Sequence, residues 1–214
     1  IRHPAKSEGL FEPDSGVLLA RRATQAVFDA AVAAGAMFVQ TGLKPDEFRE
    51  RFPAERYVFA CGPWLPRLFP EKLGRRIFPT RQDVLFLGVP ANDRRFGPEA
   101  MPAWVDFSSE FYALPDIENR GVKVALHKHG PRFDPETGSR VVSVAVVKRM
   151  SAIVAQWLPA LAAAQVAETR VCQYENSSNG DFLIDEIEPD VWIAGAGSGH
   201  GFKHGPAVGE YVAD

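Results

Sequence analysis

Residues 191–214 read VWIAGAGSGHGFKHGPAVGEYVAD, and no other stretch of the chain says as much about its fold. An apolar segment predicted to be a strand runs into a glycine-rich loop, and Pro206 follows where a first helical turn can begin. Such a loop lets the backbone approach a ligand closely, and the N-terminus of the next helix offers unpaired N–H groups and positive potential. The stretch therefore predicts a site for a phosphate or another negatively charged group. The loop lacks the usual G-x-G-x-x-G spacing, and a flexible loop with a solvent-exposed Lys203 is the other interpretation that these residues allow.

Short apolar or alternating segments, bounded by turn residues, make up most of the remaining chain and predict strands. The expected strands are residues 56–60, 77–89 (containing VLFLGV and entered through 79–82), 105–114 and 121–129 (a pair joined by a turn at 116–119), 169–174, 182–184 and 191–194. Helices are expected at residues 21–35, ending at Gly35, at 151–164 with a break near Pro159, and from Ala207 onward. This order predicts an α+β fold whose largest element is an antiparallel sheet.

Composition narrows the class of protein. The chain has 214 residues, 46% hydrophobic and 24% charged, with a formal net charge of -3. Its Lys and Arg residues are scattered rather than clustered, so we expect no nucleic-acid partner. No apolar run approaches the roughly 20 residues that span a bilayer, so we expect no membrane partner. The absence of a signal peptide and the presence of only two cysteines favour the cytoplasm. Because the chain opens at Ile1 without Met, it is expected to be a piece of a longer protein.

A family resemblance rests first on the loop. The string Gly199-His200-Gly201-Phe202-Lys203, with Gly205 and Gly209 after it, is similar to the C-terminal motif of the monomeric sarcosine oxidase and N-methyltryptophan oxidase family, a group of D-amino-acid-oxidase-like flavoproteins. Further segments resemble this family in its own order and at its intervals across nearly the whole chain. They are Phe11-Glu12-Pro13-Asp14-Ser15-Gly16-Val17-Leu18, Ala60-Cys61-Gly62-Pro63-Trp64, Arg81-Gln82, Gly121-Val122-Lys123 with His127, Val171-Cys172-Gln173-Tyr174, and Phe182 with Ile184-Asp185.

The resemblance implies how the chain is organised. Residues 1–75 would be a remnant of an FAD-binding domain, residues 76–165 a substrate-binding domain with an antiparallel sheet, and residues 166–214 a return to the FAD-binding domain. The family's N-terminal G-x-G-x-x-G unit and its ribose-binding acid are absent from this sequence. The stretch between Gln40 and Tyr57 is also shorter than in the family, which predicts that one strand of the sheet is missing.

The cofactor implied by the resemblance is FAD, and no metal is expected. Cys172 would form a thioether to the flavin ring, although a cysteine is more often a small buried hydrophobic residue. The turn with Cys61, Gly62 and Trp64 would lie along the flavin, with Cys61 packing there. The loop residues that would bind the cofactor are Gly197, Gly199, His200, Gly201, Phe202 and Lys203, with His200 contributing a backbone N–H.

The catalytic residues implied by the resemblance are Lys123, Tyr112 and His127. Reduction of O₂ by reduced flavin creates superoxide, and the fixed cation of Lys123 would stabilise that anion. Val122, Val124 and Leu126 alternate with Lys123, so its side chain would lie on the opposite face of the strand. A solvated lysine on an edge strand, tyrosines packed in a sheet and a structural histidine are the alternatives.

The implied reaction is the oxidation of a secondary amine or N-methyl amino acid to an imine, with O₂ converted to H₂O₂. Lys203 would bind the substrate carboxylate as a point charge, and Tyr112 and Tyr174 would lie near the substrate. The amine and O₂ would be the partners, and the complete enzyme is expected to be a monomer. Other possibilities are a flavin dehydrogenase, an oxidase of pipecolate or of a glycated amino acid, and an inactive fragment that serves only as a binding module.

Overall fold

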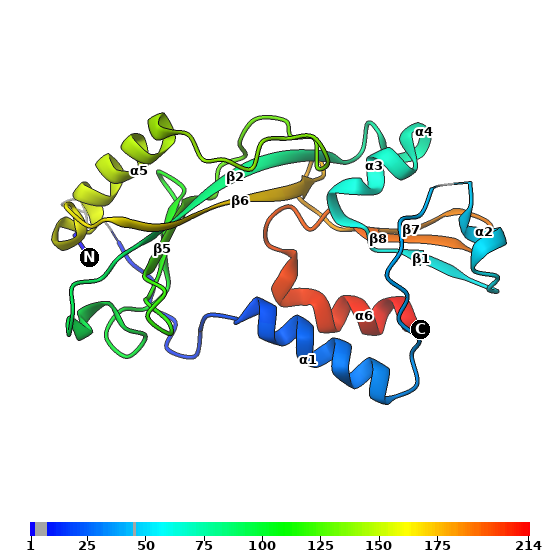
Figure 1. Cartoon of the computed structure of the whole chain (residues 1–214), viewed down its shortest axis with the longest axis horizontal. Helices are drawn as coiled ribbons and strands as arrows, with labels where there is room; N and C mark the ends of the chain where they lie inside the picture. Colours follow the sequence, from blue (N-terminus) through cyan, green and yellow to red (C-terminus); the bar gives the residue numbers. More distant parts are fainter. Residues whose placement is uncertain (3–7, 45) are drawn as a thin grey trace. The chain divides into compact units, whose positions relative to one another are not determined.

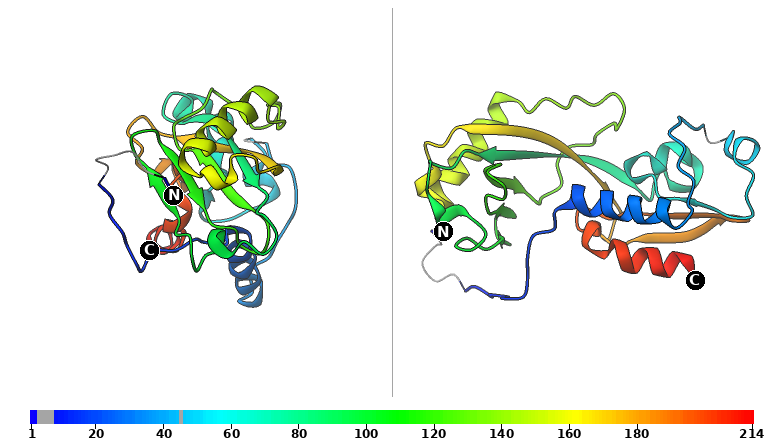
Figure 2. Two further views of the ribbon diagram at one scale, coloured as in Figure 1. Left: turned by 90° about the vertical axis from the view of Figure 1, so that its left-hand side faces the viewer. Right: turned by 60° about the horizontal axis from the view of Figure 1, so that its bottom comes forward.

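The chain forms two compact units, each with its own sheet. The computed structural model describes residues 1–2, 8–44 and 46–214. The first unit comprises Ile1–Val17 and Arg81–Cys172, and the second comprises Leu18–Thr80 and Gln173–Asp214. Figures 1 and 2 show the helices and strands of both units. The unit boundaries fall inside two long strands, β2 (Phe78–Leu87) and β6 (Val166–Asn176), so residues of both strands belong to each unit.

The first unit is built on the five-stranded sheet, whose strand order is β3-β4-β5-β2-β6. The remaining strands are β3 (Trp104–Asp106), β4 (Phe111–Leu114) and β5 (Val122–Leu126), each antiparallel to its neighbour in the segment β3-β4-β5-β2. The helix α5 (Val144–Trp157) belongs to this unit, together with the short 3-10 turns η2 (Arg94–Phe96) and η3 (Pro159–Leu161).

The core of the first unit lies between α5 and one face of this sheet. Met150 and Val154 are buried on the helix, and they join a cluster of strand residues on the facing side of the sheet. These strand residues alternate along each strand and include Leu85, Leu87, Phe111, Ala113, Val122 and Val124. Each such side chain, when fully buried, stabilises the fold by about 1.5–3 kcal/mol. The alternate residues Val84, Phe86 and Ala125 point to the opposite face and form a smaller cluster with Tyr112.

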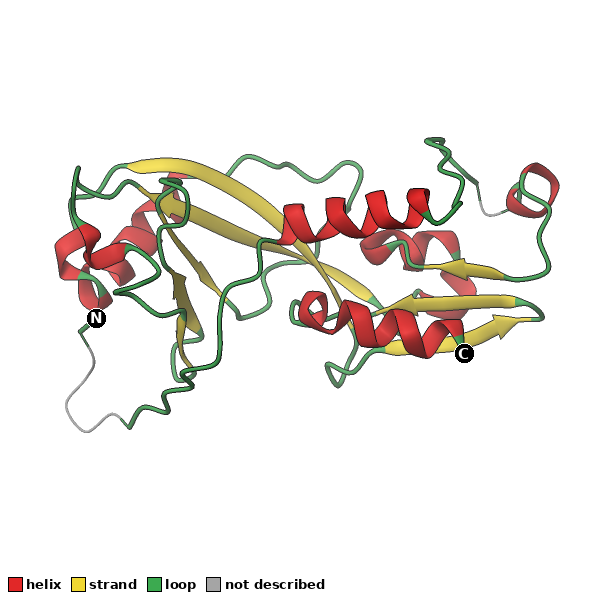
Figure 3. Cartoon of the chain, turned by 90° about the horizontal axis from the view of Figure 1, so that it is seen from below, coloured by secondary structure: helices red, strands yellow, loops and turns green. Residues whose placement is uncertain are grey.

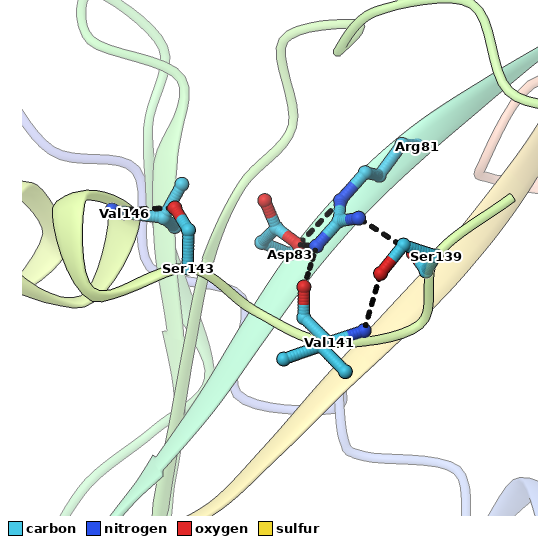
Figure 4. Close-up of polar contacts among 6 residues, drawn as sticks. All are labelled: Arg81, Asp83, Ser139, Val141, Ser143 and Val146. Carbon is cyan, nitrogen blue, oxygen red and sulfur yellow. Dashed lines mark hydrogen bonds and ion pairs between the residues drawn. The ribbon is translucent and has the colours of Figure 1, made fainter.

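Two neighbouring residues of β2 fasten the segment that follows β5. The Arg81 guanidinium binds the Asp83 carboxylate at 2.7 Å and donates to the carbonyl oxygens of Ser139 and Val141 at 2.6 and 2.7 Å (Figure 4). Gln82 is buried and donates from its side chain to the carbonyls of Leu126 and Lys128. The Arg-Gln pair thus holds both the end of β5 and the approach to α5.

The second unit contains a three-stranded sheet with the order β1-β8-β7. The strands are β1 (Tyr57–Phe59), β7 (Leu183–Glu188) and β8 (Val191–Gly195), with β1 parallel and β7 antiparallel to β8. Its helices are α1 (Ala20–Ala33), α2 (Phe48–Arg51), α3 (Leu65–Leu68), α4 (Pro70–Leu73) and α6 (Gly205–Ala213), with 3-10 turns η1 (Gly62–Trp64) and η4 (Gly201–His204).

The core of the second unit lies where α3 and α4 meet this sheet. Leu65 and Leu73 are fully buried against Val191 and Ile193 of the central strand, and aromatic side chains complete the cluster. The helices α1 and α6 lie on the same face of the sheet in the views of Figures 1 and 3. None of the residues of α1 is buried, although Val27, Phe28 and Val32 form the apolar stripe that its sequence pattern predicts.

The α+β prediction with antiparallel pairing is confirmed, and most of the predicted elements are present. The helix predicted at 21–35 is α1, and Gly35 follows it with φ +98°, as a glycine that ends a helix often does. The strands predicted at 56–60, 169–174, 182–184 and 191–194 are β1, β6, β7 and β8. The turn predicted at 116–119 joins β4 to β5.

Three predicted boundaries are wrong. The helix predicted at 151–164 is α5, which begins at Val144 because the Ser143 hydroxyl caps the Val146 N–H at 3.3 Å, and it ends before Pro159. Residues 79–82 do not lead into β2 but belong to it. The segment 105–114 is two strands, because the Asp106 carboxylate accepts hydrogen bonds from Ser108 and Ser109 and closes a turn between them.

Among the residues that the structure describes, no helix combines the length and the apolar composition needed to cross a bilayer.

Candidate functional site

Lys123 lies on a central strand of the first unit. Its strand, β5, is hydrogen-bonded to β2 on one side and to β4 on the other, so Lys123 pairs with Phe86 and with Leu114. Residues directly opposite one another in antiparallel strands share a face, which places Lys123 with Phe86 and Tyr112 and away from α5. The Nζ atom of Lys123 lies 5.6 Å from the centroid of the Tyr112 ring. Lys123 is thus not a solvated lysine on an edge strand.

The surroundings of Lys123 disfavour its charge. Burial lowers the pKa of its ammonium group, and the positive charges of Arg120 and Arg170 lower this pKa further. Negative charge on Cys172 would act in the opposite direction and raise the pKa of Lys123. Cys172 lies on β6, which is separated from β5 by the single strand β2 in the same sheet. A half-buried ammonium group acts more strongly on a neighbouring anion than an exposed one does, because less water screens it.

A charged cluster that sequence reasoning missed lies beside Lys123. The Glu168 carboxylate binds the Arg120 guanidinium through two hydrogen bonds, of 2.9 and 3.1 Å, and also binds Arg170. These contacts lower the pKa of Glu168 to about 2, Arg120 contributing most. Arg120 also lies over the ring of Phe86, with its Cζ atom 4.0 Å from the ring centroid. Arg120 adjoins the Gly-x-Lys motif in sequence, which is the signal that could have found it.

The other predicted residues of the first unit differ in exposure. The Cys172 thiol is exposed on β6, where a ligand can reach it. His127 lies just beyond the end of β5, and its backbone N–H donates to the carbonyl of Glu110 at 2.7 Å. That contact fixes the position of the His127 backbone but does not involve its imidazole ring.

The glycine-rich loop of the second unit borders a cavity of about 340 Å³. This volume is at the lower end of the range for small-molecule pockets. The cavity is lined by Gln173, Tyr174, Glu175, Phe182, Ala194, Gly195, Gly197, Gly199, Gly201, Phe202, Gly205 and Val208. The structure therefore brings together Tyr174 and most of the predicted loop residues. His200 and Lys203 are not among the described residues that line this cavity.

Three glycines of the cavity wall lie close against side chains, and the backbone conformation requires glycine at Gly199. A Cβ atom at Gly199 would lie 2.3 Å from the Tyr174 ring, and Gly199 has φ +80°. A Cβ atom at Gly195 would lie 2.3 Å from Leu65, and one at Gly201 would lie 3.1 Å from Phe182. These glycines let aromatic and aliphatic side chains pack directly on the backbone of the loop.

Glu175 is a second residue that sequence reasoning missed. It follows the predicted Cys-x-Tyr motif directly and lines the cavity. Its Oε1 atom accepts a hydrogen bond from the Gly197 N–H at 3.4 Å, while its Oε2 atom is buried without a hydrogen-bond partner among the described residues. Burial raises the pKa of Glu175, and the N–H groups of Gly197 and Ala196 partly offset this rise.

The predicted turn at Cys61 is the 3-10 turn η1, with Gly62 at φ +55°. The surrounding protein raises the pKa of the Cys61 thiol, and the Glu175 carboxylate raises it further. Cys61 is exposed at the start of this turn and belongs to the same unit as Glu175. Trp64 is half-buried at the end of the turn.

Three further predicted or neighbouring residues of the loop are His200, which directly precedes η4, and Phe202 and Lys203 within η4. Lys203 is exposed, and Phe202 keeps 49% of its surface exposed. The ring of His200 is held by its Nε2 atom, 3.0 Å from the carbonyl oxygen of Gly180. Phe182 lies edge-on to both His200 and His204, with ring centroids 5.8 and 5.6 Å apart.

Each unit thus contains a group of residues that could take part in binding or chemistry. The first unit offers a half-buried cation beside a tyrosine and an exposed thiol, which suit the stabilisation of an anion and attachment of a ligand. The second unit offers a glycine-lined cavity with an unpartnered carboxyl oxygen in its wall. A buried polar atom without a partner in a cavity wall is a feature of a site built around a polar ligand, and it fits FAD.

Comparisons with known proteins agree on one family. Residues 2–214 match the family described as "DAO: FAD dependent oxidoreductase". Monomeric sarcosine oxidase from Bacillus sp. (strain NS-129) is 29% identical over 234 residues, which cover 100% of this chain and 59% of that protein. N-methyl-L-tryptophan oxidase from Salmonella arizonae is 27% identical and is covered to 60% by the whole of this chain. The chain therefore spans about three fifths of the length of these curated relatives.

Solved structures share the fold. Iminodiacetate oxidase from Chelativorans sp. BNC1 superposes with a TM-score of 0.68 at 19% identity, over 90% of this chain and 53% of that one. The fructosamine oxidase Amadoriase II from Aspergillus fumigatus superposes with a TM-score of 0.64 at 20% identity, over 75% of this chain and 39% of that one.

Proposed function

The chain belongs to the family of DAO-type FAD-dependent oxidoreductases, and we propose that the protein carrying it is an FAD-dependent oxidase of secondary amines or N-methyl amino acids. The observation that carries this proposal is the position of Lys123, half-buried on a central strand of the sheet whose strand β6 carries the exposed Cys172. Two of the similar proteins, monomeric sarcosine oxidase and N-methyl-L-tryptophan oxidase, are named for such substrates.

The chain's own residues would divide the work between cofactor and substrate. Bound FAD supplies the two-electron oxidation of the amine and the transfer of those electrons to O₂. Lys123 places a cation where negative charge develops on oxygen, and Tyr112 borders the same position. The loop backbone and Tyr174 shape the cavity, and Lys203 and His200 are assigned to substrate and cofactor by resemblance. His127 is assigned a place near the flavin by resemblance.

Cys172 is proposed to hold the flavin covalently through a thioether. Its exposure on β6 supports this proposal, because a thiol enclosed by the protein could not be reached by a flavin ring. In the whole protein the flavin should stay with the precipitate after acid denaturation. Cys172→Ala should release it to the supernatant, while Cys61→Ala, the matched control, should retain it. Release of all flavin from the unaltered protein would exclude the attachment.

Substrate oxidation tests the proposed activity directly. The whole protein is purified, its visible absorbance is recorded for bound flavin, and H₂O₂ is measured with sarcosine, N-methyl-L-tryptophan, pipecolate and a fructosyl amino acid. We expect bound flavin and H₂O₂ formation with sarcosine or N-methyl-L-tryptophan. A flavoprotein that oxidises these amines only with an artificial electron acceptor would be a dehydrogenase. Protein without flavin and without H₂O₂ formation would contradict the proposal.

A further inference from the structure

Glu175 ties strand β6 to the glycine-rich loop. Besides the Oε1 contact to the Gly197 N–H, the backbone carbonyl of Glu175 accepts a hydrogen bond from the Ser198 N–H at 2.9 Å. Two positions further along, the Ser177 N–H donates to the Ser198 hydroxyl at 3.3 Å. The loop is therefore anchored to the end of β6 by both backbone and side-chain contacts.

The anchored segment has a backbone conformation that needs support. Ala196 and Ser198 have φ +58° and +46°, and Gly199 follows at φ +80°. A residue with a Cβ atom in this left-handed region costs about 1–2 kcal/mol, and such residues persist where the surrounding structure holds them. The Glu175 side chain contacts Gly197, the residue between the two strained ones, so its hydrogen bond acts at the centre of the segment.

The carboxyl group of Glu175 has an environment that favours its neutral form. Its Oε2 atom lies against Gly195, where a Cβ atom would come within 3.1 Å of it. This atom has no hydrogen-bond partner among the described residues, and burial raises the pKa of the group. Cys61 is the titratable residue whose charge interacts with it from the η1 side. A neutral carboxyl group can keep the Gly197 contact through Oε1 at a smaller desolvation cost than a carboxylate.

We propose that Glu175 is a positioning residue, whose carboxyl group holds residues 195–199 in the conformation that shapes the cavity. The link to activity rests on the proposed function, because it requires that this cavity receives the flavin or its substrate. The fastening of the loop does not depend on that function. The residues assigned above to cofactor or substrate binding were not assigned this role of positioning residues 195–199.

Hydrogen exchange of the loop tests the proposal with a set of substitutions. Glu175→Gln keeps the shape and an acceptor oxygen without a titrating group, Glu175→Ala removes the contact, and Glu188→Gln is a matched control on an exposed glutamate of the same unit. Exchange at residues 195–205 is followed in the whole protein by mass spectrometry. Loss of one buried hydrogen bond should speed exchange about tenfold in Glu175→Ala. Glu175→Gln should restore most of the protection, and the control should match the unaltered protein.

Two results would overturn the proposal. Unaltered exchange in Glu175→Ala would show that the carboxyl group does not hold the loop. Equal loss of protection in Glu175→Gln and Glu175→Ala would show that an acceptor oxygen at this position does not hold the loop. Flavin content is recorded for every variant from its visible absorbance, and we expect a severalfold decrease in Glu175→Ala that Glu175→Gln reverses. Absence of flavin from the unaltered protein would contradict the proposed function instead, and the exchange comparison would still decide the role of Glu175.

Discussion

Lys123 is the single residue on which the oxidase assignment depends most. A cation about 4 Å from a developing superoxide, at an effective dielectric constant near 20, contributes about 4 kcal/mol, or roughly three powers of ten in rate. In the whole protein Lys123→Met should therefore slow the reoxidation of reduced flavin by O₂ by about two to three orders of magnitude. Reduction of the flavin by amine under anaerobic conditions should change far less. Stopped-flow mixing measures the two half-reactions separately.

The control for this experiment is Lys128→Met, which removes an exposed lysine shortly after the same strand. It should leave both rates unchanged. Equal loss in both half-reactions would mark Lys123 as a general active-site or structural residue. No loss in either would contradict the proposed role.

The stability of the first unit should depend on pH through the ionisation of Glu168. Its pKa is lowered to about 2 from an ordinary value of 4.5, first by Arg120 and then by Arg170. Because the folded state holds the group ionised, this stabilisation is present above pH 4.5 and is lost as the pH falls toward 2. Partly exposed ion pairs contribute about 1 kcal/mol or less, so Glu168→Gln should lower the unfolding free energy by about that amount near neutral pH.

Urea unfolding followed at several pH values between 7 and 2 measures this effect. The difference between the two proteins should shrink as the pH falls through the range from 4.5 to 2. A difference that stays constant over that range would show that the Arg120–Glu168–Arg170 cluster does not stabilise the fold through charge.

At the level of elements, the contacts of Arg81 on strand β2 should stabilise the first unit. The Arg81 guanidinium and the Asp83 carboxylate are each only 16% exposed, and the same guanidinium also binds two carbonyl groups of the segment before α5 (Figure 4). Arg81→Met would leave Asp83 without its partner and both carbonyls without theirs. We expect a loss of about 2–4 kcal/mol in unfolding free energy, measured by urea denaturation.

Arg149→Met is the comparison for this substitution, because Arg149 is exposed on α5 in the same unit. It should change the unfolding free energy by less than about 0.5 kcal/mol. Similar effects of the two substitutions would argue that the Arg81 contacts do not hold this segment in place.

The elements that could be predicted from sequence are those in which local pattern and tertiary packing agree. The run VLFLGV predicts β2 because its residues are apolar on both faces, and Val84 and Leu85 are indeed buried on opposite faces of the sheet. The start of α5 was missed because an apolar run of valines at 144–147 resembles a strand, and only the Ser143 cap reveals the helix. Residues 79–82 contain a proline and polar side chains, whose strand conformation depends on partners distant in sequence.

The candidate site, like the fold, could be predicted only in part from the sequence. The loop glycines and Tyr174 were indicated by the family resemblance, and the structure brings them around one cavity. Glu175, Arg120 and Glu168 were missed because their importance arises from burial and from charge partners, which spacing does not encode. Whether each predicted residue acts as proposed stays a prediction for the experiments above.

At the scale of the whole molecule, the sequence lacks a G-x-G-x-x-G unit, which in dinucleotide-binding folds receives the pyrophosphate at a helix N-terminus. Residues 1–214 alone should therefore bind FAD weakly or not at all. Isothermal calorimetry with FAD measures this, and riboflavin, which has no pyrophosphate, is the matched ligand: the two should give similarly weak signals. A tight one-to-one complex with FAD but not with riboflavin would contradict the prediction.

The parallel pairing of β1 with β8 has a consequence for biosynthesis. Tyr57 pairs with Val191, so the central strand of this small sheet is made long after its first neighbour. At about 5–20 residues per second, the ribosome needs at least several seconds to supply it. During that time the exposed edge of β1 and the apolar surface of α3 and α4 have no sheet to cover them. We therefore expect slow translation before Val191 to raise the risk of aggregation of the second unit.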